Sequence, residues 1–258
     1  MLPPHYNEYM LLPVLISSAF LISGENLNSP PPQQNNNLSR YIYPLCKALK
    51  CPEVIVDTKD SPGSAKWAAQ AKKVVEVWYP KITELLSTDG KDPLTGIQGK
   101  FTYKAPKQIR LVFKADLEVP AYASNDTITI SGKWIAAHPE DFGMVVHELT
   151  HVVQSYPQSE NTPWWLVEGV ADYIRWWRYE PELHAGPGQT KIDKTKSKYT
   201  DGYRTTAMWL AWTARKYNMA LVPCLDKAMR ESTNPSIVFT RLTGKNEAEL
   251  WAEFVAEQ

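Results

Sequence analysis

Residues 147–177 read HELTHVVQSYPQSENTPWWLVEGVADYIRWW, and most of what the sequence predicts depends on this stretch. It begins with an HExxH motif, in which His147 and His151 are four residues apart and Glu148 directly follows the first histidine. Residues i and i+4 of a helix project from the same face, so two imidazoles at this spacing can bind one zinc ion at about 2.0–2.1 Å. Glu148 then lies beside the metal and can take a proton from metal-activated water. The motif therefore predicts a zinc-binding helix.

A third zinc ligand is predicted on the following helix, which Thr162 and Pro163 should begin as N-cap and first helical residue. Glu168 lies there among tryptophan, leucine and valine side chains. A carboxylate is costly to bury unless it is paired or bound to a metal. We therefore expect Glu168 to bind the zinc, and the alternative is a salt bridge with Arg175 or Arg178. The Trp164–Trp165 and Trp176–Trp177 pairs are expected to pack in the core, and the alternative is an aromatic binding cleft.

Three further residues have candidate roles around the metal. Asp172 lies one helical turn after Glu168 and should accept a hydrogen bond from a ligand imidazole, the alternative being a surface carboxylate. Tyr203, in the segment DGYRTTA, is the candidate that stabilises a developing oxyanion, with a packing role as the alternative. His184 can serve instead of Tyr203 or as a spare ligand.

The order of predicted elements indicates an α+β fold, with a small N-terminal mixed sheet and helices followed by a mainly helical C-terminal half. Helices are expected after Ser61-Pro62, with a kink or end at Pro80, and near 139–155, 163–178, 201–218, 220–231 and 246–257. Pro139 is the expected first helical residue of the HExxH helix, and His138 its expected cap. The predicted strands are Glu53–Asp57, Gln108–Lys114, Val119–Ser124 and Thr127–Ser131, with a turn at Asn125-Asp126.

The N-terminus is typical of an exported protein. The apolar run Met10–Ile22 is short for a membrane span but has the length of a signal-peptide core, so residues 1–24 are predicted to be a signal peptide. An uncleaved anchor or a buried segment is the alternative. Residues 25–40 are a Pro/Asn-rich linker, and 41–258 form the domain. We expect a secreted, periplasmic or extracellular protein without stable membrane insertion after cleavage. A Cys46–Cys51 disulfide is then one expectation, and unbridged thiols are the other.

Composition and charge exclude several classes of protein. Of the 258 residues, 43% are hydrophobic and 22% charged, which is typical of a globular chain and excludes a disordered, collagen-like or coiled-coil protein. The 28 basic residues balance the 28 acidic ones, so no net charge favours nucleic-acid binding. No nucleic-acid partner is expected, and the oligomeric state is left open.

The HELTHVVQ and WWLVEGVADYIRW segments together resemble the plant basic secretory proteins and their bacterial relatives. WYPKI (Trp78–Ile82) and DGYRTTAMWLAW (Asp201–Trp212) resemble further segments of that family. The resemblance implies a zincin-like metalloprotease fold with an HExxH active-site helix. The spacing ExxxD between Glu168 and Asp172 is more broadly similar to the gluzincin metalloproteases, which implies His147, His151 and Glu168 as zinc ligands. This chain is neutral, so a function that depends on a basic surface does not carry over.

These observations predict a secreted zinc metallopeptidase that acts on a peptide or protein substrate, with Glu148 as general base. The alternating strand Thr127–Ser131 can pair with an extended substrate by strand addition. Two alternatives remain, namely a zinc amidase or esterase with a non-peptide substrate, and a non-catalytic secreted binding or defence protein on the same scaffold.

Overall fold

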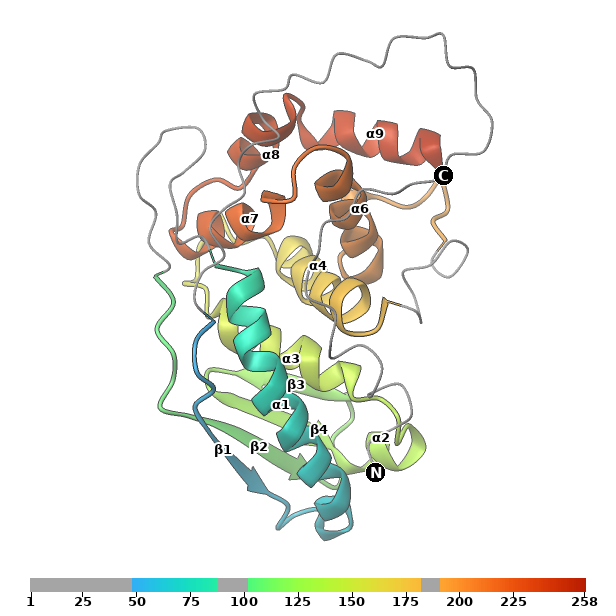
Figure 1. Cartoon of the computed structure of the whole chain (residues 1–258). Coiled ribbons are helices and arrows are strands. Elements are labelled where there is room, and N and C mark those ends of the chain that lie inside the picture. The colour runs from blue at the N-terminus through green and yellow to red at the C-terminus, as the bar shows by residue number, and fades with distance from the viewer. Residues whose placement is uncertain (1–47, 88–101, 182–190) are drawn as a thin grey trace, which may run out of the picture. The chain divides into compact units, whose positions relative to one another are not determined.

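A computed structural model describes residues 48–87, 102–181 and 191–258, which belong to one unit of the chain, Ile42–Gln258 (Figure 1). The predicted signal peptide, the predicted linker, Cys46 and His184 lie outside the described residues. The Cys46–Cys51 disulfide and the role of His184 therefore stay predictions.

A four-stranded mixed sheet has the strand order β1-β2-β4-β3. β1 (Glu53–Asp57), β2 (Gln108–Lys114) and β4 (Thr127–Ser131) are parallel, whereas β3 (Ala121–Ser124) is antiparallel to β4. The predicted small mixed sheet is confirmed, and so are the ranges of the three parallel strands. β3 begins two residues later than predicted, which fits the lack of an amide hydrogen on Pro120 for a sheet ladder.

β4 is an internal strand of this sheet, and the two edge strands are β1 and β3. β4 pairs with β2 on one side and with β3 on the other, through the turn at Asn125-Asp126, where Asn125 has a φ of 53°. The prediction that Thr127–Ser131 pairs with a substrate is therefore wrong, because both edges of this strand are already hydrogen-bonded within the sheet. Among the described strands, only β4 pairs with β3, so the second edge of β3 is left open.

Two helices pack together over the sheet, α1 (Ala65–Leu85) on the side of β1 and α3 (Gly143–Gln154) on the side of β3 and β4 (Figure 1). The strands contribute alternating apolar side chains to the core beneath them, namely Ile109, Leu111, Phe113, Ile128 and Ile130. A 3-10 turn at Pro62–Ser64 precedes α1. Pro80 lies inside α1 and does not end the helix, so of the predicted kink or end at this residue the end is wrong. The fully buried Tyr79 and Ile82 flank this proline, so packing maintains the helix where local propensity opposes it.

The start of α3 also differs from the prediction. A short helix, α2 (Gly132–Ala137), precedes it, and His138 ends α2 with its ring 4.1 Å from that of Trp134. His138 therefore does not cap the HExxH helix. That helix begins at Gly143, four residues after Pro139, because the intervening residues form a turn in which Asp141 Oδ1 accepts a hydrogen bond from the Met144 amide at 3.2 Å.

The second half of the domain is helical, as predicted. Thr162 does not cap α4 (Trp164–Ile174), because its hydroxyl donates to the Ser159 carbonyl at 2.6 Å, and Pro163 is the N-cap rather than the first helical residue. Gly169 of α4 lies against Thr206 of α6 (Tyr203–Lys216), where a Cβ atom would come within 2.3 Å of the threonine methyl group, so the two helices approach closely. The helical elements are α4 (Trp164–Ile174), a π-helix (Arg175–Tyr179), a 3-10 turn (Tyr199–Asp201), α6 (Tyr203–Lys216), α7 (Leu221–Arg230), α8 (Ser236–Thr243) and α9 (Glu247–Glu257).

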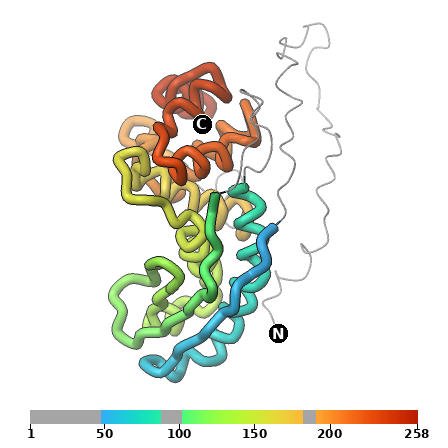
Figure 2. The backbone as a smooth tube through the Cα atoms, turned by 90° about the vertical axis from the view of Figure 1, so that its left-hand side faces the viewer, coloured from blue at the N-terminus to red at the C-terminus, as the bar shows by residue number. Residues whose placement is uncertain are grey.

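The sheet, α1 and α3 lie at one end of the described unit and α6 to α9 at the other, with α4 between them (Figures 1 and 2). The prediction of a chain that contains both helices and a small sheet is confirmed, since the structure is a mixed α/β fold with one small sheet. Of the elements here, α2 and α8 were not predicted from the sequence. Within the three described ranges, every helix is too short or too polar to cross a bilayer.

Candidate active site

The HExxH helix is fixed along its whole length. Its apolar side chains Val145, Val146 and Leu149 are fully buried. Its last turn ends at Ser155, which adopts a left-handed conformation with a φ of 37°. Arg230 of α7 donates hydrogen bonds to the carbonyl groups of Val153 and Gln154, at 3.2 and 2.8 Å, which satisfies groups that a helix end leaves unpaired. A helix held at its end and along its buried face presents its polar side chains in one defined direction.

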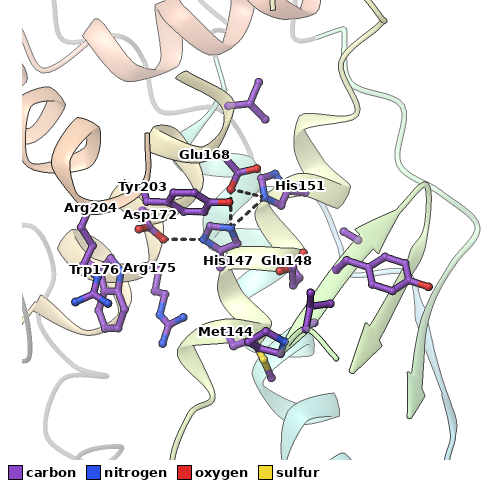
Figure 3. Close-up of a pocket in the computed structure, with 16 residues that line it drawn as sticks. Met144, His147, Glu148, His151, Glu168, Asp172, Arg175, Trp176, Tyr203 and Arg204 are labelled. Carbon is purple, nitrogen blue, oxygen red and sulfur yellow. Dashed lines mark hydrogen bonds and ion pairs between the residues drawn. The ribbon is translucent and has the colours of Figure 1, made fainter. Parts of the chain in front are cut away.

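Two side chains of α3 and one of α4 converge on a common point (Figure 3). The Nε2 atoms of His147 and His151 are 3.1 Å apart. Glu168 Oε2 lies 3.2 Å from His147 Nε2 and 3.5 Å from His151 Nε2. Among the described residues, this is the group of His, Cys, Asp and Glu side chains close enough to hold a metal ion.

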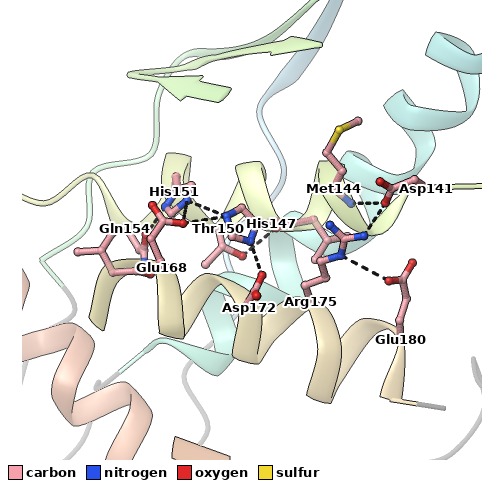
Figure 4. Close-up of polar contacts among 12 residues, drawn as sticks. Asp141, Met144, His147, Thr150, His151, Gln154, Glu168, Asp172, Arg175 and Glu180 are labelled. Carbon is pink, nitrogen blue, oxygen red and sulfur yellow. Dashed lines mark hydrogen bonds and ion pairs between the residues drawn. The ribbon is translucent and has the colours of Figure 1, made fainter. Parts of the chain in front are cut away.

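Each histidine is oriented by a hydrogen bond on its other ring nitrogen (Figure 4). His147 Nδ1 lies 2.8 Å from Asp172 Oδ1. His151 Nδ1 lies 2.7 Å from Gln154 Oε1, and the Gln154 amide nitrogen donates to the Val167 carbonyl of α4 at 2.9 Å, which fixes the orientation of that amide. Because both acceptors are oxygens, both Nδ1 atoms carry a hydrogen, and both Nε2 atoms face Glu168.

This arrangement fits a divalent metal. Two imidazole lone pairs and a carboxylate oxygen repel one another unless a cation or a proton lies between them. Two ligand atoms at about 2.0–2.1 Å from a tetrahedral zinc ion are about 3.3–3.4 Å apart, and the three observed separations are 3.1, 3.2 and 3.5 Å. Two histidines and one glutamate are also a donor set of catalytic zinc sites, which keep a fourth position open.

The electrostatics of the site reflect the same crowding. Burial lowers the pKa of His147, but the hydrogen bonds to Asp172 and Glu168 outweigh it and raise the pKa from 6.5 to about 9. Burial raises the pKa of Glu168, but the hydrogen bonds from the two histidines outweigh it and lower the pKa to about 2. Without a metal, His147 therefore keeps its proton up to about pH 9, and a cation that binds here displaces it.

Glu148 lies beside this group rather than in it. Its side chain lines a pocket of about 610 Å³ together with the two histidines, Glu168 and Asp172. Burial raises the pKa of the Glu148 carboxyl, while positive charge on the histidines and a hydrogen bond to the backbone of Ala123 in β3 lower it, and the net shift is upward. A carboxylate whose pKa is raised toward neutrality is a better proton acceptor for catalysis. The open edge of β3 forms the wall of the pocket next to this carboxylate (Figure 3).

Tyr203 also faces the pocket. Its ring lies nearly parallel to that of His147 at 6.3 Å, and the residue is 52% exposed, so it does not pack in the core. Its φ of 45° lies in the left-handed region, which is unusual for an aromatic residue and is typical of strained functional sites. The preceding Gly202 has a φ of 76°, and a Cβ atom there would come within 2.6 Å of the Trp164 ring. The charge of Glu168 is the main cause that raises the pKa of the Tyr203 phenol.

The contacts of α4 and of the π-helix that follows it test the alternatives that the sequence left open for this region. Arg175 pairs with Asp141 at 2.6 Å and with Glu180 at 3.6 Å, so the expected alternative of a salt bridge between Glu168 and Arg175 is wrong. Asp172 is buried, so it is not a surface carboxylate. Of the four tryptophans, Trp164 is 59% exposed beside Tyr203, contrary to the expected core packing.

Sequence reasoning missed two residues of the site, Gln154 and Arg204, and placed Trp176 in a cleft only as an alternative. Gln154 ends the quoted HELTHVVQ segment and lies three residues after His151, a spacing that places both side chains on one helix face. Trp176 and Arg204 line the pocket and come from different helical elements. No local signal distinguishes Arg204 from other arginines, although it directly follows Tyr203.

One comparison with known proteins identifies the family of this chain. A family model described as "Peptidase of plants and bacteria" matches residues 52–254, a range that includes every element of the pocket. The chain belongs to this family, the basic secretory protein family. No curated protein and no solved structure matches the chain. The family description therefore supports peptidase activity in general.

Proposed function

We propose that this protein is a secreted zinc-dependent metallopeptidase in which His147, His151 and Glu168 hold the metal. The observation that carries the proposal is the convergence of two imidazole nitrogens and one carboxylate oxygen within 3.5 Å of one another, in a pocket that the three residues line. The description of the family as peptidases supports the reaction class. Secretion rests on the sequence of residues 1–24 alone.

The residues of the pocket have complementary roles in this proposal. A zinc ion bound here supplies a Lewis acid that polarises a carbonyl and lowers the pKa of water. Glu148 accepts the proton of the attacking water and then returns it to the leaving amine nitrogen. The Tyr203 hydroxyl donates a hydrogen bond to the oxygen of the former carbonyl as it gains negative charge. Asp172 and Gln154 keep the two imidazoles in the tautomer that presents Nε2 to the metal.

The substrate is proposed to bind as an extended chain along β3. The second edge of β3 has no described strand partner, and residues 119–123 line the pocket beside Glu148. A peptide that adds to this edge forms main-chain hydrogen bonds with it and presents its carbonyl groups to the site. Strand addition is therefore still the proposed way in which the substrate binds, but the strand that it joins is β3 instead of Thr127–Ser131.

A peptide library tests the proposal directly. We expect the purified protein to cleave a subset of the library, a metal chelator to abolish the cleavage, and added zinc to restore it. Mass spectrometry of the products identifies the cleaved bonds and separates a peptidase from an amidase or esterase with another substrate. A zinc-loaded protein that cleaves no peptide would contradict the proposal and favour the non-catalytic alternative.

Asp172→Asn is expected to weaken zinc binding by about 10–100-fold without abolishing it. The asparagine can still accept a hydrogen bond from His147 Nδ1, where the carboxylate now lies at 2.8 Å, but it lacks the negative charge that makes the imidazole more basic. Competition with a zinc chelator measures the affinity. If Asp172→Asn impairs binding more than Glu168→Gln does, the two acids have exchanged roles.

A further inference from the structure

Two arginines of the pocket, Arg175 and Arg204, have no role in the proposed reaction. Arg204, in the first turn of α6, lines the pocket and is exposed. No acidic partner of Arg204 is found among the described residues, whereas the other arginine of the pocket, Arg175, pairs with Asp141 and Glu180. An unpaired guanidinium in a pocket of this size is available to a bound molecule.

The guanidinium of Arg204 is held in place by an aromatic ring. Its central carbon lies 5.1 Å from the centre of the Trp176 ring, and that of Arg175 lies 3.9 Å from the same ring. Stacking on an aromatic ring restricts a guanidinium while its N–H groups stay free for a planar acceptor, and a carboxylate matches that fork with two parallel hydrogen bonds. Holding the group in advance also reduces the entropy lost on binding.

Arg204 lies at a distinct end of the pocket. Figure 3 shows Arg204 and Trp176 beyond Asp172, on the side of the histidines away from the sheet strands. Two acids of the pocket, Glu168 and Asp172, contact His147. A substrate that extends from β3 across the histidines therefore leads toward Arg204.

We propose that Arg204 is a specificity-determining residue that binds a carboxylate of the substrate. The inference rests on the proposed peptidase function and names the chemistry of its substrate: a peptide with an acidic side chain or a free C-terminal carboxylate near the cleaved bond. A charge-assisted, bidentate pair of this kind gives about a 10-fold or larger preference over a neutral analogue.

Matched peptides test the preference. Starting from a peptide that the library identifies, Glu is replaced by Gln at each position, and the free C-terminus is replaced by an amide. The wild-type protein should show at least about a 10-fold higher kcat/KM for one acidic member of these pairs, which identifies the source of the carboxylate. Arg204→Gln should remove that ratio, and Arg204→Glu should reverse it in favour of Lys at the same position. Arg215→Gln, which neutralises an exposed arginine at the far end of the same helix, should leave the ratio intact.

A wild-type ratio near one for every pair would overturn the inference, and so would a ratio that Arg204→Gln leaves unchanged. Binding of the same peptides to zinc-loaded Glu148→Gln separates this inference from the proposed function. If no peptide is cleaved but acidic peptides bind at least about 10-fold more tightly through Arg204, the carboxylate site stands and the peptidase proposal fails. If peptides are cleaved without any effect of their charge, the peptidase proposal stands and the carboxylate site fails.

Discussion

Glu148→Gln is expected to lower peptide hydrolysis by at least about 10²–10⁴-fold while the zinc content of the protein stays unchanged. The substitution preserves the shape of the side chain and removes its negative charge, and with it the ability to accept a proton. Glu148 is 8% exposed and lies beside the convergent group of His147, His151 and Glu168 without belonging to it. The proton acceptor and the metal-binding group are therefore separable by mutation.

The measurement combines kcat/KM for a peptide from the library with elemental analysis of the same preparation. Glu140→Gln is a matched control, because Glu140 is an exposed acid in the turn before the HExxH helix and does not line the pocket. It should retain both activity and zinc. Activity of Glu148→Gln within about 10-fold of the wild type would exclude Glu148 as the general base. Loss of zinc in this variant would instead place the carboxylate among the metal ligands.

The candidate site was predictable from the sequence to the extent that helical periodicity determines it. The spacing of His147 and His151, and of Glu168 and Asp172, places each pair on one face of its helix, and the structure brings both faces together. The isolated acid in an apolar helix was an informative signal because burial of an unpaired carboxylate is costly. The ranges of β2 and β4 were also predictable from the sequence. Apolar residues alternate along these strands or the residues are β-branched, and turn signals flank them.

What the sequence could not provide depends on contacts between distant segments. Strand order decides that β3 rather than β4 is the open edge, and no local pattern specifies this order. Packing around Tyr79 keeps α1 intact through Pro80, which overrides the local preference of proline. Arg204 contacts Trp176 where α6 packs on α4 and on the π-helix, and Gly169 of α4 permits the close approach of α6.

Glu168→Gln and His151→Ala are each expected to abolish zinc binding at concentrations that saturate the wild type, which should bind about one zinc per chain. Each substitution removes one of three convergent donor atoms and leaves too few protein ligands for a stable site. Glu168 also contributes the negative charge of the group, since its pKa is lowered to about 2 by the hydrogen bonds from the histidines. A neutral amide oxygen replaces that charge only poorly.

Elemental analysis after dialysis gives the zinc content, and thermal unfolding with and without zinc gives an independent reading. A ligand at about 1,000 times its Kd stabilises the folded state by about 4.1 kcal/mol, so the wild type should show a large zinc-dependent increase in Tm that both variants lack. Glu160→Gln, which alters an exposed acid shortly before α4, should keep both the zinc and the increase in Tm. A full zinc content in His151→Ala would contradict the assignment of the metal to this group. A full content in Glu168→Gln alone would mean that another acid completes the site, and Asp172, 2.8 Å from His147, is then the first to test.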